Sequence, residues 1–433
     1  MMVLAHGIGT RSDLPVPLGP AAAAAGTALI ASFVILSLFR RRPRTPWPGR
    51  PLPDRATAVV DHPATRTAAR IVALTAVAAV TAVGFLGPAD SADNLAPWAF
   101  YVTFWAGLVP ASLLAGPVVR YVNPLRLVHA VLARLLRIAP DGIRTLSPRL
   151  GRWPAAAGLF AFAWLELVAP GRTDPVWVAT FVSGYAVIQL AGALVYGRTW
   201  FDRCDGFEVY SVLLGALSPL GRLADGRLGL RSPLDGLDRV EPTPGLVGVV
   251  VVLIGSTGYD GLSRTLWWVS AVDDGVAAGT LGLLATTLAA GVLYLLGCSA
   301  LTQERAHEGH RPGPTAFAST LVPIAAGYAV AHYASLLLFD GQQTLILASD
   351  PFQTGLDLFG TAGWTIDYRW AEPVGIMVVQ LVAIVGGHLV ASLAAHDRAV
   401  RMYPSGAAVR TQFPMLTAMV ALTVGAVGLL FAA

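Results

Sequence analysis

Several acidic and imidazole side chains lie inside the longest apolar stretches of this chain, where ionisable groups are costly and therefore candidates for function. Carboxylate with imidazole is the pairing used in proton relays, divalent-metal sites and general acid–base catalysis. If the stretches are helices that cross a membrane, one group of candidate catalytic residues lies toward the outer ends of these helices. We call this group the outer set; it is Glu166, Asp260, His332 and Glu372. Within it, His332 and Glu166 are the candidate ligands for a divalent metal ion.

A second group lies toward the opposite helix ends and is a candidate proton- or ion-binding site; this inner set is His388, His396, Asp205 and Glu208. At ~1.5 Å of rise per residue, His332 and His388 differ in depth by about 20 Å, so they cannot bind one metal or one haem. A neutral imidazole, hydrogen-bonded between helices, is the plain alternative for each histidine. The sequence leaves proton relay, metal binding and acid–base catalysis open.

Two other patterns are ambiguous. Asp202, Asp205 and Glu208 are three residues apart and could hold a cation or a proton on one face, but Asp205 with Glu208 also has the form of a helix-capping pair. A second pattern has the E-x-x-H and H-x-x-H spacings that place metal ligands on one face of a helix; its members are Glu304, His307, Glu308 and His310. Gly309 and Pro312 lie among these residues and favour a solvated turn instead. His6 and Asp13 are placed to fold over the outer set.

The composition identifies lipid as the solvent, because 55% of the residues are hydrophobic, 13% are charged and the mean hydropathy is +0.61. A helix needs roughly 20 residues to cross a hydrocarbon core. We expect such helices near 17–39, 68–88, 97–118, 153–170, 175–197, 244–260, 275–298, 315–338, 371–395 and 413–432. The predicted fold class is all-α, a polytopic transmembrane helix bundle forming one integral membrane domain over 1–433.

Arginine orients this bundle. All 30 basic residues are arginine, and 26 of them fall in alternate gaps between the apolar runs. By the positive-inside rule those gaps are cytoplasmic and both termini are outside, in a multi-pass protein of the plasma membrane. The net charge of +4 and the pI near 9.3 then describe an inner face that contacts anionic lipid, and they give no evidence for nucleic acid. Cys204 and Cys298 both map to this reducing side, so a disulfide is not expected.

The segments between the runs have predicted roles of their own. We expect an external N-terminal segment at 1–16, a cytoplasmic linker at 40–67, a cytoplasmic loop at 198–243 and an external loop at 339–370. Segment 120–150 is predicted to hold an amphipathic helix in the inner headgroup plane, with Asn123 as N-cap and Pro124 as first residue. The strongly apolar part of the sixth run ends near Ile254, which indicates either a broken helix lining a cavity or an early helix end with Asp260 paired to Arg264.

Missing motifs narrow the chemistry. The chain has no lysine, which excludes a Walker A nucleotide site and a Schiff-base cofactor. It also lacks the sequence motif for covalent haem attachment, the nucleophile elbow of hydrolases and the zinc-protease signature. No known motif therefore assigns a reaction.

Six stretches resemble a family of actinobacterial integral membrane proteins labelled "fenitrothion hydrolase". They are A-H-G-I-G-T-R-S-D-L-P-V-P (5–17), N-P-L-R (123–126), D-R-C-D-G-F-E-V-Y-S (202–211), G-S-T-G-Y-D-G-L-S-R-T (255–265), G-Y-A-V-A-H-Y (327–333) and G-H-L-V-A-S-L-A-A-H-D-R-A (387–399). The resemblance implies hydrolysis of an organophosphate ester but brings no catalytic residue with it.

Two functional classes follow. The first is a permease or channel for a small solute or ion, with Glu166, Asp260 and His332 as gate or proton carrier. The second is a membrane-embedded hydrolase, metal-assisted, as the resemblance implies. A non-catalytic assembly protein is the third alternative, and the substrate and oligomeric state are left open by the sequence.

Overall fold

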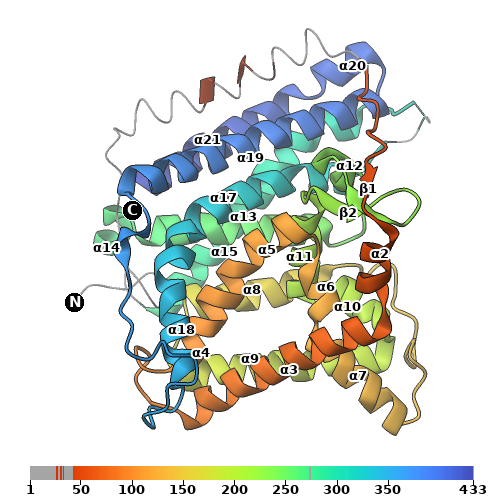
Figure 1. The fold of residues 1–433 in the computed structure, drawn as a ribbon. Helices are drawn as coiled ribbons and strands as arrows, with labels where there is room; N and C mark the ends of the chain where they lie inside the picture. Colours follow the sequence, from red (N-terminus) through yellow and green to blue (C-terminus); the bar gives the residue numbers. More distant parts are fainter. Residues whose placement is uncertain are drawn as a thin grey trace. The chain divides into compact units, whose positions relative to one another are not determined.

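The computed structural model describes residues 42–272, 275–307, 309 and 311–432, together with 26, 27, 30, 31 and 33. Over these ranges the regular secondary structure is helical apart from three short strands, with turns and loops between the elements. It divides into two compact units, each described by itself (Figure 1). Unit 1 contains Pro48–Gly236 and Tyr333–Ala371, and unit 2 contains Leu237–His332, Glu372–Ala433 and the described part of Thr10–Trp47.

Eight helices in the described ranges are long and apolar enough to cross a membrane. Those of unit 1 are α3 (Pro63–Leu86), the continuous run Leu95–Ala115 and α9 (Pro175–Tyr196). Those of unit 2 are α13 (Leu246–Ser263), α15 (Val276–Gln303), α19 (Pro373–Met402) and Gly406–Leu429, which covers most of α21 (Phe413–Ala432). The remaining one, Thr315–Ser349, passes along the sequence from unit 2 into unit 1.

These helices match eight of the ten predicted runs. The run expected at 153–170 forms α8 (Trp153–Leu167), which has 15 residues and is shorter than the other eight. The run expected at 17–39 lies mostly outside the described residues, as does the N-terminal segment 1–16. The all-helical fold is therefore confirmed, while the exact number of spans stays a prediction.

Unit 1 is organised around α11 (Gly206–Ala216), which is buried along almost its whole length. It packs against α5 (Gly107–Ala115), α6 (Val118–Val122), α8 and α10 (Arg198–Cys204). The rings of Phe207 and Phe162 lie edge-on with their centroids 5.4 Å apart, and the centroid of the Trp105 ring lies 4.2 Å from that of Phe162. The segment 198–243, predicted as a loop between membrane spans, thus contains helices whose apolar residues are held inside the unit by aromatic packing. Its cytoplasmic location stays a prediction.

The segment predicted as a linker, 40–67, is also partly ordered. It contains β1 (Arg50–Pro51), α2 (Asp54–Asp61) and the start of α3, whose N-terminus is capped by His62. β1 pairs with β3 (Leu228–Leu230), which pairs on its other side with β2 (Leu220–Arg222), so the sheet order is β1-β3-β2 and both pairings are antiparallel. This small sheet ties the segment before α3 to the segment after α11.

In unit 2, glycines bring neighbouring helices into close contact. A Cβ at Gly255 of α13 would overlap the backbone of Thr287 in α15, and a Cβ at Gly387 of α19 would overlap the carbonyl oxygen of Pro323 in α17 (Val322–Ser335). Small residues at such contacts are typical of helix pairs in membranes. Because α17 and α19 run antiparallel here, His388 lies near the level of Pro323, and His332 lies about 14 Å further along α17.

The sixth and eighth runs differ from expectation. α13 continues unbroken through Gly255–Asp260 to Ser263, so the broken-helix interpretation is wrong. The hydroxyls of Ser256 and Thr257 donate to backbone carbonyls one turn earlier, which satisfies them inside an intact helix. The eighth run continues through η3 (Leu336–Asp340) and α18 (Gly341–Ser349), so the loop expected at 339–370 begins only after Ser349.

The amphipathic helix expected in 120–150 is α7 (Pro124–Leu135), and the Asn123 side chain caps it by accepting from the amide of Leu125. The part of the segment after α7 is not helical. The apolar face of α7 points outward, since Leu135 is 72% exposed. Arg126 and His129 face into unit 1 and make contacts within the protein, whereas Arg134 of the same helix is exposed.

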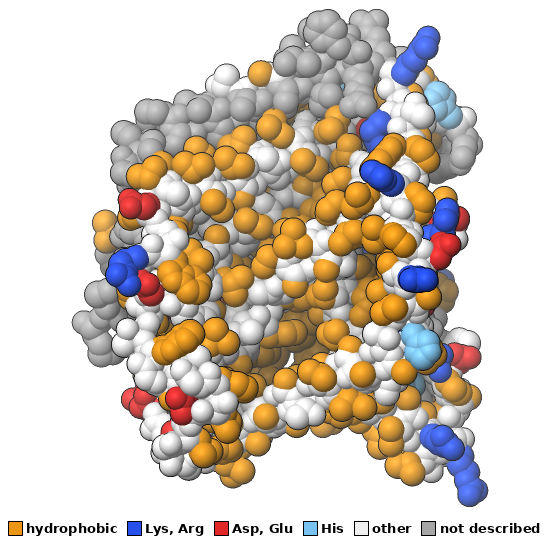
Figure 2. All heavy atoms as spheres, viewed as in Figure 1, with side chains coloured by type: hydrophobic (Ala, Val, Ile, Leu, Met, Phe, Trp, Pro, Cys, Tyr) orange, Lys and Arg blue, Asp and Glu red, His pale blue; other side chains and the backbone are white. Residues whose placement is uncertain are grey.

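Arginines of different gaps meet at the same end of unit 1. Arg66 lies over the ring of Tyr121, Arg222 pairs with Asp61, and Arg126 contacts α10 through Asp202. Figure 2 shows hydrophobic side chains along α3 and basic ones gathered over β1, α2 and α7. The gaps after the first, third and fifth runs thus share one end in unit 1, which agrees with alternate crossing of a membrane.

The glycine contact between α17 and α19 supplies a matched pair of substitutions. We expect Gly387→Ala to destabilise the protein by about 2 kcal/mol, because the new methyl group meets backbone that cannot rotate away. Gly386→Ala on the same helix has nothing within 4 Å of its Cβ and should cause no loss. Thermal unfolding of both variants in detergent tests this, and equal melting temperatures would show that the contact is not tight.

Candidate functional site

Two clusters of buried ionisable side chains stand out, one in each unit. In unit 2, Asp260 near the end of α13 is 3% exposed and lies between two basic groups. Arg264 donates from one Nη to both oxygens of Asp260, at 2.9 and 3.0 Å. His332 Nε2 lies 2.8 Å from Asp260 Oδ2. We call Asp260, Arg264 and His332 the Asp260 trio.

Helical geometry assembles the trio. Asp260 and Arg264 are one turn apart on the same helix, the pairing that was predicted as the alternative to a broken helix. His332 comes from the C-terminal part of α17, where the Tyr328 ring stacks on it with centroids 5.8 Å apart. The Tyr328 hydroxyl donates to the carbonyl of Thr257 at 3.2 Å and so fixes α17 against α13. The carboxylate is therefore held beside an imidazole whose proton it can stabilise.

The three side chains of the trio differ in their solvent exposure. The side chain of Asp260 is 4% exposed, that of His332 is 10% exposed, and that of Arg264 is 25% exposed. The carboxylate is thus the most buried group of the trio and the Arg264 guanidinium the most exposed. The arrangement suits proton binding and charge gating at a helix end, because imidazole is the side chain that titrates near neutral pH.

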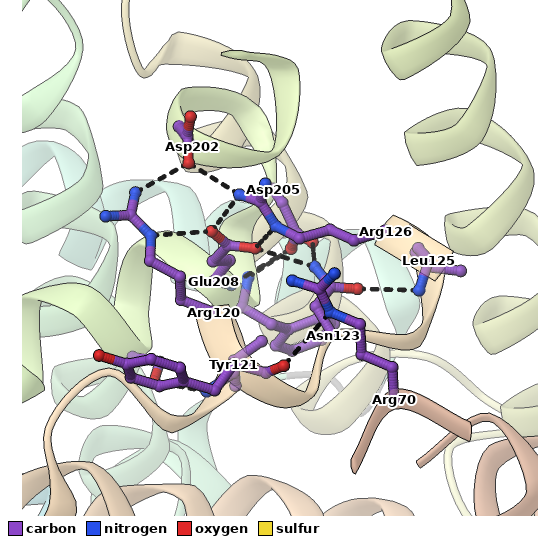
Figure 3. Close-up of polar contacts among 12 residues, drawn as sticks. Arg70, Arg120, Tyr121, Asn123, Leu125, Arg126, Asp202, Asp205 and Glu208 are labelled. Carbon is purple, nitrogen blue, oxygen red and sulfur yellow. Dashed lines mark hydrogen bonds and ion pairs between the residues drawn. The ribbon is translucent and has the colours of Figure 1, made fainter. Parts of the chain in front are cut away.

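In unit 1, three carboxylates and two arginines converge around Glu208, which is fully buried (Figure 3). Arg126 donates from Nε to Glu208 at 2.9 Å, and Arg120 donates from Nε to Glu208 at 3.2 Å. Both arginines also reach Asp202, at 2.7 and 2.9 Å. We call Arg120, Arg126, Asp202, Asp205 and Glu208, with Asn123, the Glu208 cluster.

Asn123 joins the two buried acids of this cluster. Its Nδ2 donates to Asp205 and to Glu208, at 3.0 Å in each case, while its Oδ1 caps α7. Asp205 in turn accepts from the amides of Phe207 and Glu208 at the start of α11 and from the Tyr185 hydroxyl at 2.7 Å. The predicted capping role of Asp205 is confirmed, and the cations held by the predicted acidic face are the arginine guanidinium groups.

Electrostatics separate the two buried acids. Burial, together with the charge of Glu208 nearby, raises the pKa of Asp205 to about 6. Glu208, in contrast, contacts two arginines. The cluster can therefore carry an exchangeable proton at Asp205, but all its charged groups are already engaged in locking α7 onto α10 and α11.

The other members of the outer set are placed differently. Glu166 is 6% exposed at the end of α8 and accepts from the Tyr333 hydroxyl at 3.4 Å, which itself accepts from Trp105 at 2.6 Å. Glu372 is exposed at the start of α19. Glu166 belongs to unit 1, whereas Asp260, His332 and Glu372 belong to unit 2. The structure brings His332 to Asp260, and the inclusion of Glu166 stays a prediction.

The members of the inner set are likewise divided between the two units. His388 is 2% exposed and donates from Nδ1 to the Ile384 carbonyl at 2.8 Å, and His396 lies 3.2 Å from the side-chain oxygen of Gln412. Both belong to unit 2, while Asp205 and Glu208 belong to unit 1, so a joint site stays a prediction. Asp397, beside His396, pairs with Arg44 and Arg401.

The arrangement of potential ligand side chains gives no further support to the predicted metal site. Within the described ranges no three His, Cys, Asp or Glu side chains are clustered so that they could hold a metal ion. Glu308 and His310 of the E-x-x-H spacing, like His6 and Asp13, lie outside the described residues. Cys204 and Cys298 are buried free thiols, as expected.

Sequence reasoning missed the arginine partners of the Glu208 cluster. Arg120 and Arg126 were assigned to the membrane surface, yet they neutralise acids 82 positions away. A usable signal was present, because three acids spaced for one helical face require cations if that face is buried. The cations that meet these acids come from the preceding arginine-rich gap.

Burial predicts unequal roles for Glu208 and Asp202. Both contact Arg120 and Arg126, but Glu208 is fully buried whereas the Asp202 side chain is 42% exposed. Glu208→Gln leaves two arginines without their buried anion and should lower the free energy of unfolding by about 3 kcal/mol. Asp202→Asn should cost less than about 1 kcal/mol. Chemical denaturation in detergent compares them, and equal losses would contradict the proposed dependence on burial.

The raised pKa of Asp205 predicts a pH effect on stability. The folded protein keeps this proton up to about pH 6, whereas the unfolded chain releases it near 3.8. Protonation therefore stabilises the folded state below that range, and the gain is lost as the pH rises through 6. Between pH 7 and 5 the wild type should gain about 1 kcal/mol relative to Asp205→Asn. Parallel melting curves at both pH values test this, and an identical pH dependence in the two proteins would refute it.

Comparisons with family models, with curated proteins and with solved structures found no match to this chain. Function must therefore be argued from the Asp260 trio, the Glu208 cluster and the apolar helices that carry them.

Proposed function

We propose that this chain is a multi-span membrane permease for a small solute or ion, with the Asp260 trio as its proton-carrying gate. The eight apolar helices support the membrane part of the proposal. The observation that carries the rest is a buried carboxylate shared by an arginine and a histidine, on two helices that are long enough to span. Ionisable residues in such helices typically mark ion and proton pathways.

The charge of the trio depends on one proton. With a neutral imidazole, Asp260 and Arg264 balance each other, and protonation of His332 adds one positive charge at a site where uncompensated charge is costly. An arriving anion or a departing proton relieves that cost. Solute binding and proton binding at this site would thus be linked, which is the requirement for a proton-coupled carrier.

The geometry of His332 favours this role over hydrolysis. Its Nε2 lies 2.8 Å from Asp260 Oδ2, so this ring nitrogen already faces a carboxylate. A general base for ester hydrolysis needs a ring nitrogen within reach of the attacking water. The organophosphate hydrolase implied by the sequence resemblance is therefore the second choice.

We further propose that the arginine-rich ends face the cytoplasm of a plasma-membrane protein and contact anionic lipid. The shared location of the arginine gaps in unit 1 supports this orientation. Because α13 begins after the arginine-rich segment 198–243 and the trio lies at its C-terminal end, the sequence pattern predicts the Asp260 trio toward the external side.

Proton flux tests the gate directly. Purified protein is reconstituted in liposomes that contain a pH-sensitive dye, and a pH gradient with a potassium diffusion potential is imposed. We expect the wild type to dissipate the gradient, and His332→Ala and Asp260→Asn to slow the flux about tenfold or more, the loss typical of a missing acid–base group. The matched control is His388→Ala, since His388 is also a largely buried histidine of unit 2 but contacts no carboxylate among the described residues.

A second assay separates the two functional classes. The same detergent-solubilised protein is given a chromogenic phosphotriester. Turnover that His332→Ala abolishes, in a protein that moves no protons, would replace the permease with the hydrolase. Equal flux in His332→Ala and His388→Ala would remove the trio from the pathway.

A further inference from the structure

Arg70 of α3 occupies an unusual position at the arginine-rich end of unit 1. Its Nε donates to the carbonyl of Tyr121 at 3.3 Å, which leaves both Nη groups of the guanidinium available (Figure 3). One turn earlier, Arg66 lies over the ring of the same Tyr121, 5.6 Å from its centroid. The side chain of Arg70 is thus held in place through Nε, while its two Nη groups, which can bind two oxygens of an anion, make no such bond to any residue that the structure describes.

The neighbours of Arg70 are mostly cations. Arg66, Arg126 and Arg198 are all within electrostatic range of it, from α3, α7 and the start of α10. The carboxylates nearby are already engaged, because Asp61 binds Arg66 and Arg222 while Glu208 binds Arg120 and Arg126. Among the described residues no carboxylate lies within ion-pair distance of Arg70. The position therefore has an excess of positive charge.

Apolar side chains flank this charge on the outer surface. Ile71 and Val72, directly after Arg70, are 51% and 69% exposed, and Val131 and Leu135 of α7 are 51% and 72% exposed. α3 and α7 pack against each other, so these side chains border the same region of unit 1. A charged guanidinium at the edge of an exposed apolar surface matches a molecule with an anionic head and hydrocarbon chains.

We propose that Arg70, with Arg66 and Arg198 beside it, binds the phosphate of an anionic phospholipid whose acyl chains lie along the exposed faces of α3 and α7. The guanidinium fork suits two phosphate oxygens at once. The site lies near the N-terminal end of a membrane-spanning helix, where a phospholipid headgroup is found. The proposal does not depend on the permease function.

Lipid retention tests the site. The protein is purified from detergent containing equal amounts of phosphatidylglycerol and phosphatidylcholine, and the bound lipids are counted by native mass spectrometry. We expect the wild type to retain phosphatidylglycerol preferentially. Arg70→Gln should reduce that retention about fivefold, which corresponds to ~1 kcal/mol per arginine at an anionic surface.

Arg55→Gln is the matched control, because Arg55 is an exposed arginine of α2 in the same unit. It removes the same charge and should leave retention unchanged. Arg70→Lys keeps the charge but not the fork, and it should retain less lipid than the wild type even if Arg70→Gln does not fold. Equal loss in Arg70→Gln and Arg55→Gln, no bound phosphatidylglycerol in the wild type, or displacement of the lipid by millimolar inorganic phosphate would each overturn the proposal.

Discussion

The structure depends on one electrostatic constraint: a carboxylate removed from water must be held beside a cation or hydrogen-bond donors. Glu208 meets two arginines in unit 1, Asp260 meets an arginine and a histidine in unit 2, and Asp397 meets Arg44 and Arg401. Breaking such a pair leaves a buried charge without compensation, which is far more costly than losing an exposed pair. The positions of the helices are therefore coupled to the positions of their charges.

The two main clusters meet this constraint in different ways. In the Glu208 cluster both arginines are permanently charged and every carboxylate contacts them or Asn123, so the cluster fixes α7 to α10 and α11. In the Asp260 trio one of the two basic partners is an imidazole, whose charge changes with a single proton. The first arrangement is suited to rigidity and the second to switching, which is why the proposed gate is assigned to unit 2.

Helix packing supports both clusters. In unit 1 the rings of Trp105, Phe162 and Phe207 fill the space around α11 and hold its acidic N-terminus in place. In unit 2 glycines allow α13 to approach α15, and α17 to approach α19, at backbone distance. The hydrogen bond from Tyr328 to the carbonyl of Thr257 joins α17 to α13, the two helices that carry His332 and Asp260.

Several features that depend on residues within a turn or two of one another could be predicted from the sequence, some of them as one of two alternatives, because helical periodicity is a local property. These features include the long apolar helices, the caps at Asn123 and Asp205 and the pairing of Asp260 with Arg264. Only the tertiary structure decided that α11 is buried, that Arg120 and Arg126 neutralise acids far along the chain, and that His332 is the partner of Asp260. Those outcomes depend on which helix faces pack together, and neither the composition nor the residue spacing predicts this.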